Sequence, residues 1–287
     1  MTEPRHFFVA IDVAAEDADV TSGELFELGA TGVEERDEGT LARGAAGKTT
    51  LVASFENEKA ARDAQKKLGA GARIEELVGD AWRDAWKEHF RPFRLCQGLW
   101  VRPPWQEHAP KRGEKVLVLE PGRAFGTGLH ETTRLVAAAI AMLHRTLPQT
   151  SVLDVGTGSG ILALTAIALG AKDALGVDND ADAIEVAKEN AARNAMSERA
   201  AFATTPIARV RGTFGLVLAN IEADVLVGMK AALVARVAQG GRLVLSGILA
   251  SREADVRAAF GKPIERAELS SATDDDKWVA MTYTQSR

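Results

Sequence analysis

The chain has 287 residues, of which 46% are hydrophobic and 26% are charged, and its formal net charge at pH 7 is −5. These proportions are typical of a globular chain long enough for one large or two smaller domains. No apolar run in the sequence approaches the roughly 20 residues that a membrane helix needs, so we do not expect a bilayer-spanning protein. The single cysteine, Cys96, excludes an internal disulfide and a cysteine-rich zinc site. The first residues lack a signal-type segment, so we expect a cytoplasmic protein.

Residues 1–78 alternate between strand and helix patterns in the order βαββαβ, which is that of a small ferredoxin-like α+β domain. The expected strands are 6–13, 31–36, 49–55 and 73–78, and the expected helices are 16–28 and 57–68. Nine Lys and Arg stand against sixteen Asp and Glu in this part, a net charge of −7. Such an excess fits either a solvated acidic surface or a module that docks a basic partner.

Residues 79–112 differ from both flanks and are expected to form a helical, proline-bearing linker. Trp82, Trp86 and Phe90 recur every four residues, so they lie on one stripe of a helix. Packing explains this stripe better than a ligand cage does. Four prolines between residues 92 and 110 then predict an extended or looped segment.

From residue 113 to 287, strand and helix patterns alternate, which predicts a parallel sheet with right-handed crossovers. The expected strands are 115–119, 152–155, 174–177, 214–219, 242–246, 264–269 and 278–284. The expected helices are 133–143, 161–169, 180–194, 223–237 and 251–260. No helix pattern separates the last two strands, so they are expected to pair as a hairpin.

The most informative local pattern is VLDVGTGSGILALTAIALGAKDALGVDND, residues 152–180. A strand ends in the glycine turn 156–160, a helix follows, and Asp178 comes directly after the next strand. A glycine turn between a parallel strand and a helix lets a ligand approach the backbone closely. An acid at the tip of the next strand can hydrogen-bond a ribose. The arrangement therefore predicts a site for an adenosine-bearing cofactor.

The glycine spacing indicates which cofactor this is. Dinucleotide sites use G-x-G-x-x-G, whereas this chain has G-x-G-x-G, preceded by Asp154. A carboxylate there would repel a pyrophosphate. S-adenosylmethionine has no phosphate and carries a positive sulfonium and a positive ammonium, so it tolerates the acid. We therefore predict an S-adenosylmethionine-dependent methyltransferase that holds its cofactor with Asp154, Gly156, Gly158 and Asp178, in preference to a ligand-free glycine turn.

Further motifs lie on both sides of this segment. The sequences RAFGTG at 123–128 and HETT at 130–133 precede it, and LANI at 218–221 and LSGIL at 245–249 follow it. In this order the set resembles the PrmA family, bacterial methyltransferases of ribosomal protein eleven of the large subunit, over essentially the whole chain. The resemblance implies a class I, Rossmann-like methyltransferase sheet whose last strand runs antiparallel, together with an N-terminal domain that recognises the substrate.

The chain departs from the family pattern at two places. Where the family commonly has Thr-His-Pro-Thr-Thr, this chain has Leu-His-Glu-Thr-Thr at 129–133. Where the family commonly has Asn-Ile-Leu-Ala-Gly-Pro-Leu, this chain has Asn-Ile-Glu-Ala-Asp-Val-Leu at 220–226. Because the matched Thr133 and Asn220 are retained, these changes concern the substrate more than the cofactor.

The resemblance implies that Thr133, Gly156, Asp178 and Asn220 match the family's cofactor contacts. Asn220 is also the candidate catalytic residue, since its side-chain carbonyl can orient a neutral amine for in-line attack on the methyl group. Two plainer readings remain: Thr133 caps its helix, and Asn220 is a turn residue that closes a strand. His130 is a second candidate for base chemistry, although we favour a role in shaping the glycine loop.

No metal site is expected. The remaining histidines are scattered without ligand spacing. Acidic residues between 178 and 189 imitate a calcium loop, but Ala183 stands where such a loop needs glycine.

The preferred function is N-methylation of lysine side chains and/or the N-terminal amine of a basic ribosomal protein of the large subunit. Methylation of RNA, or of lysines in another protein, is the alternative, and a non-catalytic cofactor-binding protein is a third reading. The net charge of −5 argues against direct nucleic-acid binding, which relies on clustered Lys and Arg. We expect a monomer that does not associate with membranes.

Overall fold

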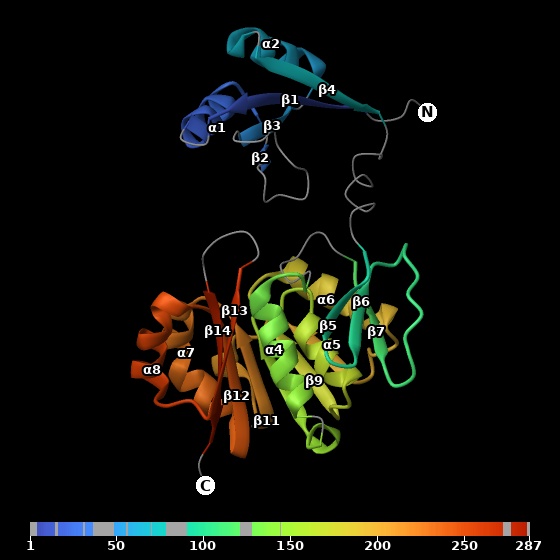
Figure 1. Ribbon diagram of the computed structural model, residues 1–287, viewed down its shortest axis with the longest axis vertical. Helices are drawn as coiled ribbons and strands as arrows, with labels where there is room; N and C mark the ends of the chain where they lie inside the picture. The colour runs from blue at the N-terminus through green and yellow to red at the C-terminus, as the bar shows by residue number, and fades with distance from the viewer. Residues whose placement is uncertain are drawn as a thin grey trace. The chain divides into compact units, whose positions relative to one another are not determined.

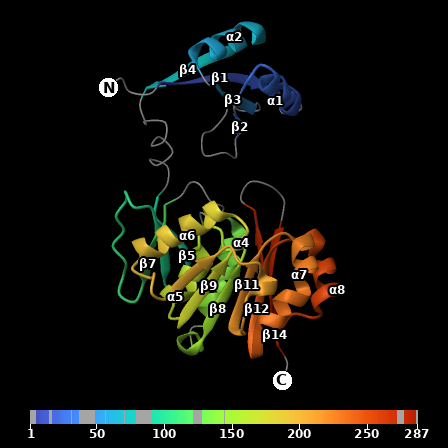
Figure 2. The ribbon, with the colours of Figure 1, turned by 180° about the vertical axis from the view of Figure 1, so that it is seen from behind.

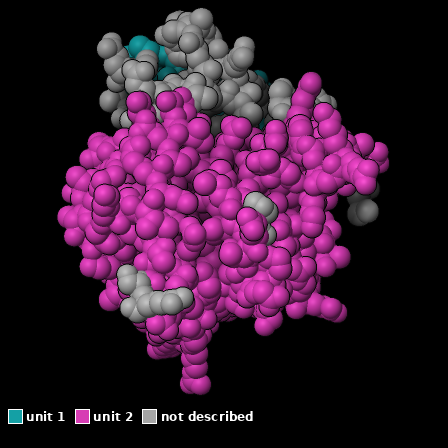
Figure 3. Space-filling view, turned by 60° about the horizontal axis from the view of Figure 1, so that its bottom comes forward, with its two compact units in different colours: residues 1–90 teal, residues 91–287 magenta. Residues whose placement is uncertain are grey.

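The structure is a computed structural model of the chain. It describes residues 5–14, 17–30, 32–36, 49–55, 57–69, 71–78, 91–120, 128–143, 145–271 and 277–285. The chain divides into two compact units, Met1–Phe90 and Arg91–Arg287, which Figure 3 colours separately. Each unit has its own sheet and its own hydrophobic core, so each is described by itself.

The first unit is a four-stranded antiparallel sheet with two helices, and its strand order is β2-β3-β1-β4. Its elements are β1 (Arg5–Val13), α1 (Ala18–Glu27), β2 (Gly32–Arg36), β3 (Thr49–Phe55), α2 (Glu58–Leu68) and β4 (Ala72–Val78). Helix α2 begins where the Asn57 side chain accepts a hydrogen bond from the Ala60 amide, and it buries Ala61 and Ala64 against the sheet. The predicted ferredoxin-like order is confirmed, and each element ends within two residues of its expected bounds.

The second unit is built on a seven-stranded sheet with the order β10-β9-β8-β11-β12-β14-β13 (Figures 1 and 2). The first five strands are parallel, and β14 runs antiparallel to both of its neighbours. Its strands are β8 (Ser151–Val155), β9 (Asp173–Val177), β10 (Ala200–Ala203), β11 (Phe214–Asn220), β12 (Val237–Leu249), β13 (Glu265–Ser270) and β14 (Lys277–Thr284). Its helices are α4 (Glu131–Met142), α5 (Ile161–Ala168), α6 (Ala181–Arg193), α7 (Ala223–Arg236) and α8 (Glu253–Phe260). This is the class I methyltransferase sheet that was expected, with its final antiparallel hairpin.

Alternate residues of the central strands feed two cores on opposite faces of this sheet. Along β11, Leu216 and Leu218 pack with residues of α4, α5 and α6, whereas Val217 and Ala219 pack with residues of α7 and α8. Both faces of the strand are thus buried, which is why these strands are continuous apolar runs. Polar residues therefore follow these apolar runs at the carboxyl ends of the strands, where the candidate site described below is located.

The expected linker differs from the structure in its second half. Residues 91–112 lie within the second unit, where β5 (Phe93–Cys96) and β6 (Leu99–Arg102) join β7 (Lys115–Val118) in a separate three-stranded sheet. The prolines of this segment indicated an extended or looped chain, so β5 and β6 were not recognised as strands. The predicted aromatic helix with Trp82, Trp86 and Phe90 lies outside the described residues, and so does the segment 123–127 of the upstream glycine motif.

Two further elements of the sheet depart from expectation. The edge strand β10 was not predicted, because its sequence AAFA carries no strong strand signal. Strand β12 begins directly after α7 and runs for 13 residues, whereas the expected strand covered only 242–246. Its register with β11 shifts between Phe214 and Leu216. Gly240 and Gly241 therefore lie in an irregular part of this strand pairing and do not end the strand.

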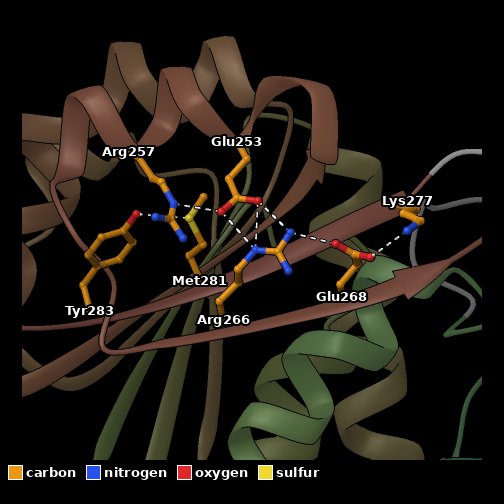
Figure 4. Close-up of polar contacts among 7 residues, drawn as sticks. All are labelled: Glu253, Arg257, Arg266, Glu268, Lys277, Met281 and Tyr283. Carbon is orange, nitrogen blue, oxygen red and sulfur yellow. Dashed lines mark hydrogen bonds and ion pairs between the residues drawn. The ribbon is translucent and has the colours of Figure 1, made fainter.

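The last hairpin covers the edge of the sheet with charges (Figure 4). The Nε of Arg266 on β13 lies 3.0 and 2.9 Å from the two carboxylate oxygens of Glu253 in α8, and its Nη2 lies 2.7 Å from Glu268. Arg257 and Lys277 extend this cluster at 2.8 and 3.2 Å. The guanidinium of Arg266 holds the pKa of Glu253 below its usual range. Because β13 is exposed along its length, these charges oppose pairing with the edge of another sheet.

Gly247 permits a close crossing of two backbones beside the carboxyl end of β11. Its φ is +81°, and a Cβ there would lie 2.5 Å from the carbonyl oxygen of Ile221. The Ile221 amide donates to the carbonyl of Ser246 at 3.1 Å. The residue that directly follows Asn220 is therefore held against β12 only because position 247 has no side chain.

We predict that Gly247→Ala lowers the free energy of unfolding by roughly 2–4 kcal/mol. The alanine would have to keep a positive φ, and its Cβ would clash with the backbone of Ile221. Urea unfolding monitored by circular dichroism measures this change. Gly228→Ala in α7 is the matched control, because its Cβ would meet nothing within 4 Å. The control should be neutral or slightly stabilising. Equal stabilities for the two variants would show that the crossing is not tight.

Candidate functional site

The glycine turn 156–160 joins the tips of β8 and β9. Gly156, Gly158 and Gly160 have φ values of +70°, +51° and +79°, which residues with a side chain rarely adopt. The amides of Gly156 and Thr157 donate to the Val177 carbonyl at 2.9 and 3.1 Å. The turn is therefore folded back onto the neighbouring strand by its own backbone.

The third amide of the turn bonds to the acid that follows β9. Gly158 N donates to Asp178 Oδ2 at 2.9 Å, and Asp180 N donates to Asp178 Oδ1 at 3.1 Å. Each carboxylate oxygen of this half-buried side chain keeps a lone pair for a further donor, such as a ribose hydroxyl. Three successive amides of the turn are thus engaged within the protein. A phosphate, which is normally bound by such amides, would find them already paired.

Asp154 is a fully buried carboxylate one residue before the end of β8. Its Oδ2 accepts from Thr157 Oγ1 at 2.7 Å and from Ala163 N at 3.2 Å. Its Oδ1 is buried and has no hydrogen-bond partner among the described residues. The pKa of Asp154 is raised to about 6, mainly by desolvation and to a smaller extent by the charge of Asp178, while the two hydrogen bonds oppose the rise. A nearby positive charge would relieve this penalty.

Asn220 is the last residue of β11, and its amide meets the first turn of α4. Its Nδ2 lies 3.5 Å from the hydroxyl oxygen of the buried Thr133. Its Oδ1 is buried and lacks a partner within the described parts of the chain. Next to it, Ile221 lies 3.5 Å from the position that a Cβ of Gly156 would take. The structure therefore brings Thr133, Gly156 and Asn220 together from three separate elements.

The reading of Thr133 as a helix cap is wrong, because His130 caps α4. The His130 Nδ1 accepts from Thr132 N at 3.3 Å and lies 2.8 Å from Thr132 Oγ1. Its ring also meets the Trp278 ring edge-on, with centroids 4.9 Å apart. These contacts give His130 a structural role at the start of α4, whereas residues 123–127 of the glycine loop that it was expected to shape lie outside the described residues. Trp278 was expected only as a strand residue, since its neighbour is 148 positions away in the sequence.

The donor and acceptor groups of the site fit a cationic cofactor and do not fit a pyrophosphate. β9, β8 and β11 are adjacent in the sheet, and their ends carry Asp178, Asp154 and Asn220. Two orphan acceptor oxygens and two carboxylates make this edge electronegative. Sulfonium and ammonium groups would be attracted there, whereas phosphates would be repelled.

Two other classes of site gain no support from the described residues. Among them, no group of three or more His, Cys, Asp or Glu side chains is placed to hold a metal ion. In the same part of the chain, no helix combines the length and the apolar character that crossing a bilayer requires.

Comparisons with known proteins find relatives that match most of the chain. The family model described as ribosomal protein L11 methyltransferase (PrmA) matches residues 6–286. A ribosomal protein L11 methyltransferase of Sorangium cellulosum is 54% identical over 90% of this chain and 84% of its own length. One from Geobacter sulfurreducens is 40% identical over 88% and 84%. The crystal structure of a ribosomal protein L11 methylase from Lactobacillus delbrueckii subsp. bulgaricus is 29% identical, has a TM-score of 0.59, and covers 69% of this chain and 100% of that chain.

We predict that Asp154→Asn removes a pH dependence of stability. The folded pKa of Asp154, about 6, lies above its unfolded value of 3.8, so the folded state binds the proton more tightly than the unfolded state does. The stability gained from this proton is fully present below pH 3.8 and is lost as the pH rises through 6. Relative to the variant, the wild-type protein should therefore lose up to about 3 kcal/mol of unfolding free energy between pH 4 and pH 7. Urea titrations of both proteins at these two pH values measure the difference. A difference that does not vary with pH would contradict the prediction.

Proposed function

The chain belongs to the PrmA family of ribosomal protein L11 methyltransferases, and we propose that it transfers methyl groups from S-adenosylmethionine to lysine side chains and/or the N-terminal amine of ribosomal protein L11. The observation that carries the proposal is the electronegative edge of the sheet, where Asp154 and Asn220 each have a buried acceptor oxygen that no described residue pairs with. S-adenosylmethionine supplies an electrophilic methyl group on a positively charged sulfonium.

Four groups would hold the cofactor. The methionine part would approach the backbone at Gly156 and Gly158, which have no side chain of their own and take φ values of +70° and +51°. Asp178 would accept from the ribose hydroxyls with its remaining lone pairs. Asp154 would offset the positive charge of the cofactor, and Thr133 would present its hydroxyl. These assignments rest on the unpaired acceptors and on the missing side chains of the turn.

Asn220 would act on the amine that receives the methyl group. Only a neutral amine has a lone pair for attack, and a free lysine titrates near ~10.4. Desolvation and the neighbouring sulfonium both favour the neutral form. The Oδ1 of Asn220 can accept one N–H of this amine, while its Nδ2 is turned toward Thr133. The lone pair is then aimed at the methyl group, and the rate gain comes from alignment.

The first unit is the proposed docking module for the substrate. Residues 1–78 carry a net charge of −7, which complements a basic ribosomal protein. This part is also a compact unit separate from the sheet that bears the site. Because the substrate is a ribosomal protein, we propose that the reaction takes place in the cytoplasm. We also propose that the enzyme acts as a monomer and does not bind nucleic acid directly.

Incubation with radiolabelled S-adenosylmethionine, ribosomal protein L11 and ribosomal RNA should place label on L11 alone. Residues 91–287, tested in parallel, should bind the cofactor but lose most of the transfer to L11, since the acidic module is missing. Mass spectrometry then maps the methylated amines. Label on RNA alone would reject the proposed substrate. Undiminished transfer by the shortened chain would reject the docking role of residues 1–78.

Asn220→Ala should lower kcat by about a hundredfold or more while changing the Kd for S-adenosylmethionine by less than about tenfold. The reason is that the substitution removes the acceptor that orients the amine and leaves the glycine turn intact. Steady-state kinetics and calorimetry separate the two constants. Thr133→Ser, which keeps the hydroxyl, should retain activity. Loss of cofactor affinity with an unchanged kcat would contradict the role given to Asn220.

A further inference from the structure

One face of helix α6 carries three polar residues that meet the chain leaving β7. Asn190, Arg193 and Asn194 are spaced three and four positions apart, so they share this face. The Asn194 amide group accepts from Val118 N at 2.8 Å and donates to Val118 O at 2.7 Å. Since β7 is at the edge of its sheet, this side chain takes the place of a neighbouring strand. Arg193 pairs with Glu120 at 2.6 Å.

Asn190 differs from the other two because it also reaches the glycine turn. It is fully buried, its Nδ2 donates to the Ser159 carbonyl at 3.0 Å, and its Oδ1 accepts from Glu120 N at 3.3 Å and from Arg193 Nη1 at 2.9 Å. One side chain therefore bonds two segments that are 39 residues apart. This position requires a donor and an acceptor on a short uncharged group, which an amide supplies and a carboxylate does not.

The glycine turn is then held from two sides. On one side, Gly158 N is bonded to Asp178, and on the other, the next carbonyl, that of Ser159, is bonded to Asn190. Glycine-rich backbone has little intrinsic preference for one conformation, so these bonds define the shape of the turn. If the bond to Ser159 is lost, the turn can shift relative to Asp178, although neither residue has been changed.

We propose that Asn190 is a positioning residue for cofactor binding: it fixes the 156–160 turn against Asp178 through the Ser159 carbonyl. This inference rests on the proposed function of the site. It assigns no contact between Asn190 and the cofactor itself. The effect should appear in cofactor affinity, because both turn and acid face the cofactor, and much less in the rate of transfer once the cofactor is bound.

The test compares two substitutions one helical turn apart, Asn190→Asp and Asn194→Asp. Each exchanges an amide donor for a carboxylate oxygen. The first removes the bond to Ser159, whereas the second removes bonds to Val118 and to the helix backbone but none to the glycine turn. Calorimetry with S-adenosylhomocysteine, the demethylated product, measures Kd without turnover. Asn190→Ser is a second variant that buries no charge.

Urea midpoints first show that each variant is folded under the conditions of the binding measurement. Both Asn190 variants should then raise the Kd for S-adenosylhomocysteine about tenfold or more, and Asn194→Asp should raise it by less than about threefold. The KM for S-adenosylmethionine should rise with little change in kcat at saturating cofactor. Equal weakening by both positions, or unchanged affinity in Asn190→Ser, would overturn the inference. Wild-type protein that does not bind S-adenosylhomocysteine would instead overturn the proposed function, and this inference with it.

Discussion

The buried carboxylate of Asp154 is the constraint on which the site depends. It is withdrawn from water at the tip of β8, with one oxygen bonded to Thr157 and Ala163 and the other without a partner in the described residues. A carboxylate in that position destabilises the protein at neutral pH, and Asp178 nearby adds to the cost. The positive sulfonium and ammonium of S-adenosylmethionine would be attracted to the same charge, which is why Asp154 is part of the proposed cofactor site.

The parallel sheet explains how residues that are distant in the sequence come to lie near Asp154. Strands β9, β8 and β11 are neighbours, so Asp178, Gly156 and Asn220 end at one edge although 64 residues separate the first glycine of the turn from Asn220. Ligands of such sheets bind beyond the carboxyl ends of the strands. The close crossing at Gly247 then holds the chain that follows Asn220 in place. The residues proposed to orient the substrate amine and those proposed to bind the cofactor therefore lie at the ends of neighbouring strands.

The glycine turn differs from a phosphate-binding turn in how its amides are paired. In phosphate sites, the amides of such a turn face the ligand. Here the amides of Gly156, Thr157 and Gly158 bond to Val177 and Asp178. The Ser159 carbonyl of the same turn accepts a hydrogen bond from Asn190. These paired amides and the carboxylates of Asp154 and Asp178 both disfavour a phosphorylated ligand.

Much of the fold could be predicted from local patterns, because periodicity and turn residues act within a few positions. The βαββαβ order of the first unit, the strands and helices around Gly156, and the candidate residues Asp178 and Asn220 were all recognisable in this way. The sequence could not reveal β10, whose residues carry no strong strand signal, or the β5–β6 pair, which lies in a segment whose prolines indicated a loop. Nor could it show that Thr133 turns to Asn220, or that Asn190 reaches Ser159, because each contact joins separate elements. The chain by itself determined which groups would stand at the strand ends, because each follows an apolar strand in the sequence. Tertiary packing decided which of their oxygens are left without a partner among the described residues, because the possible partners come from other elements.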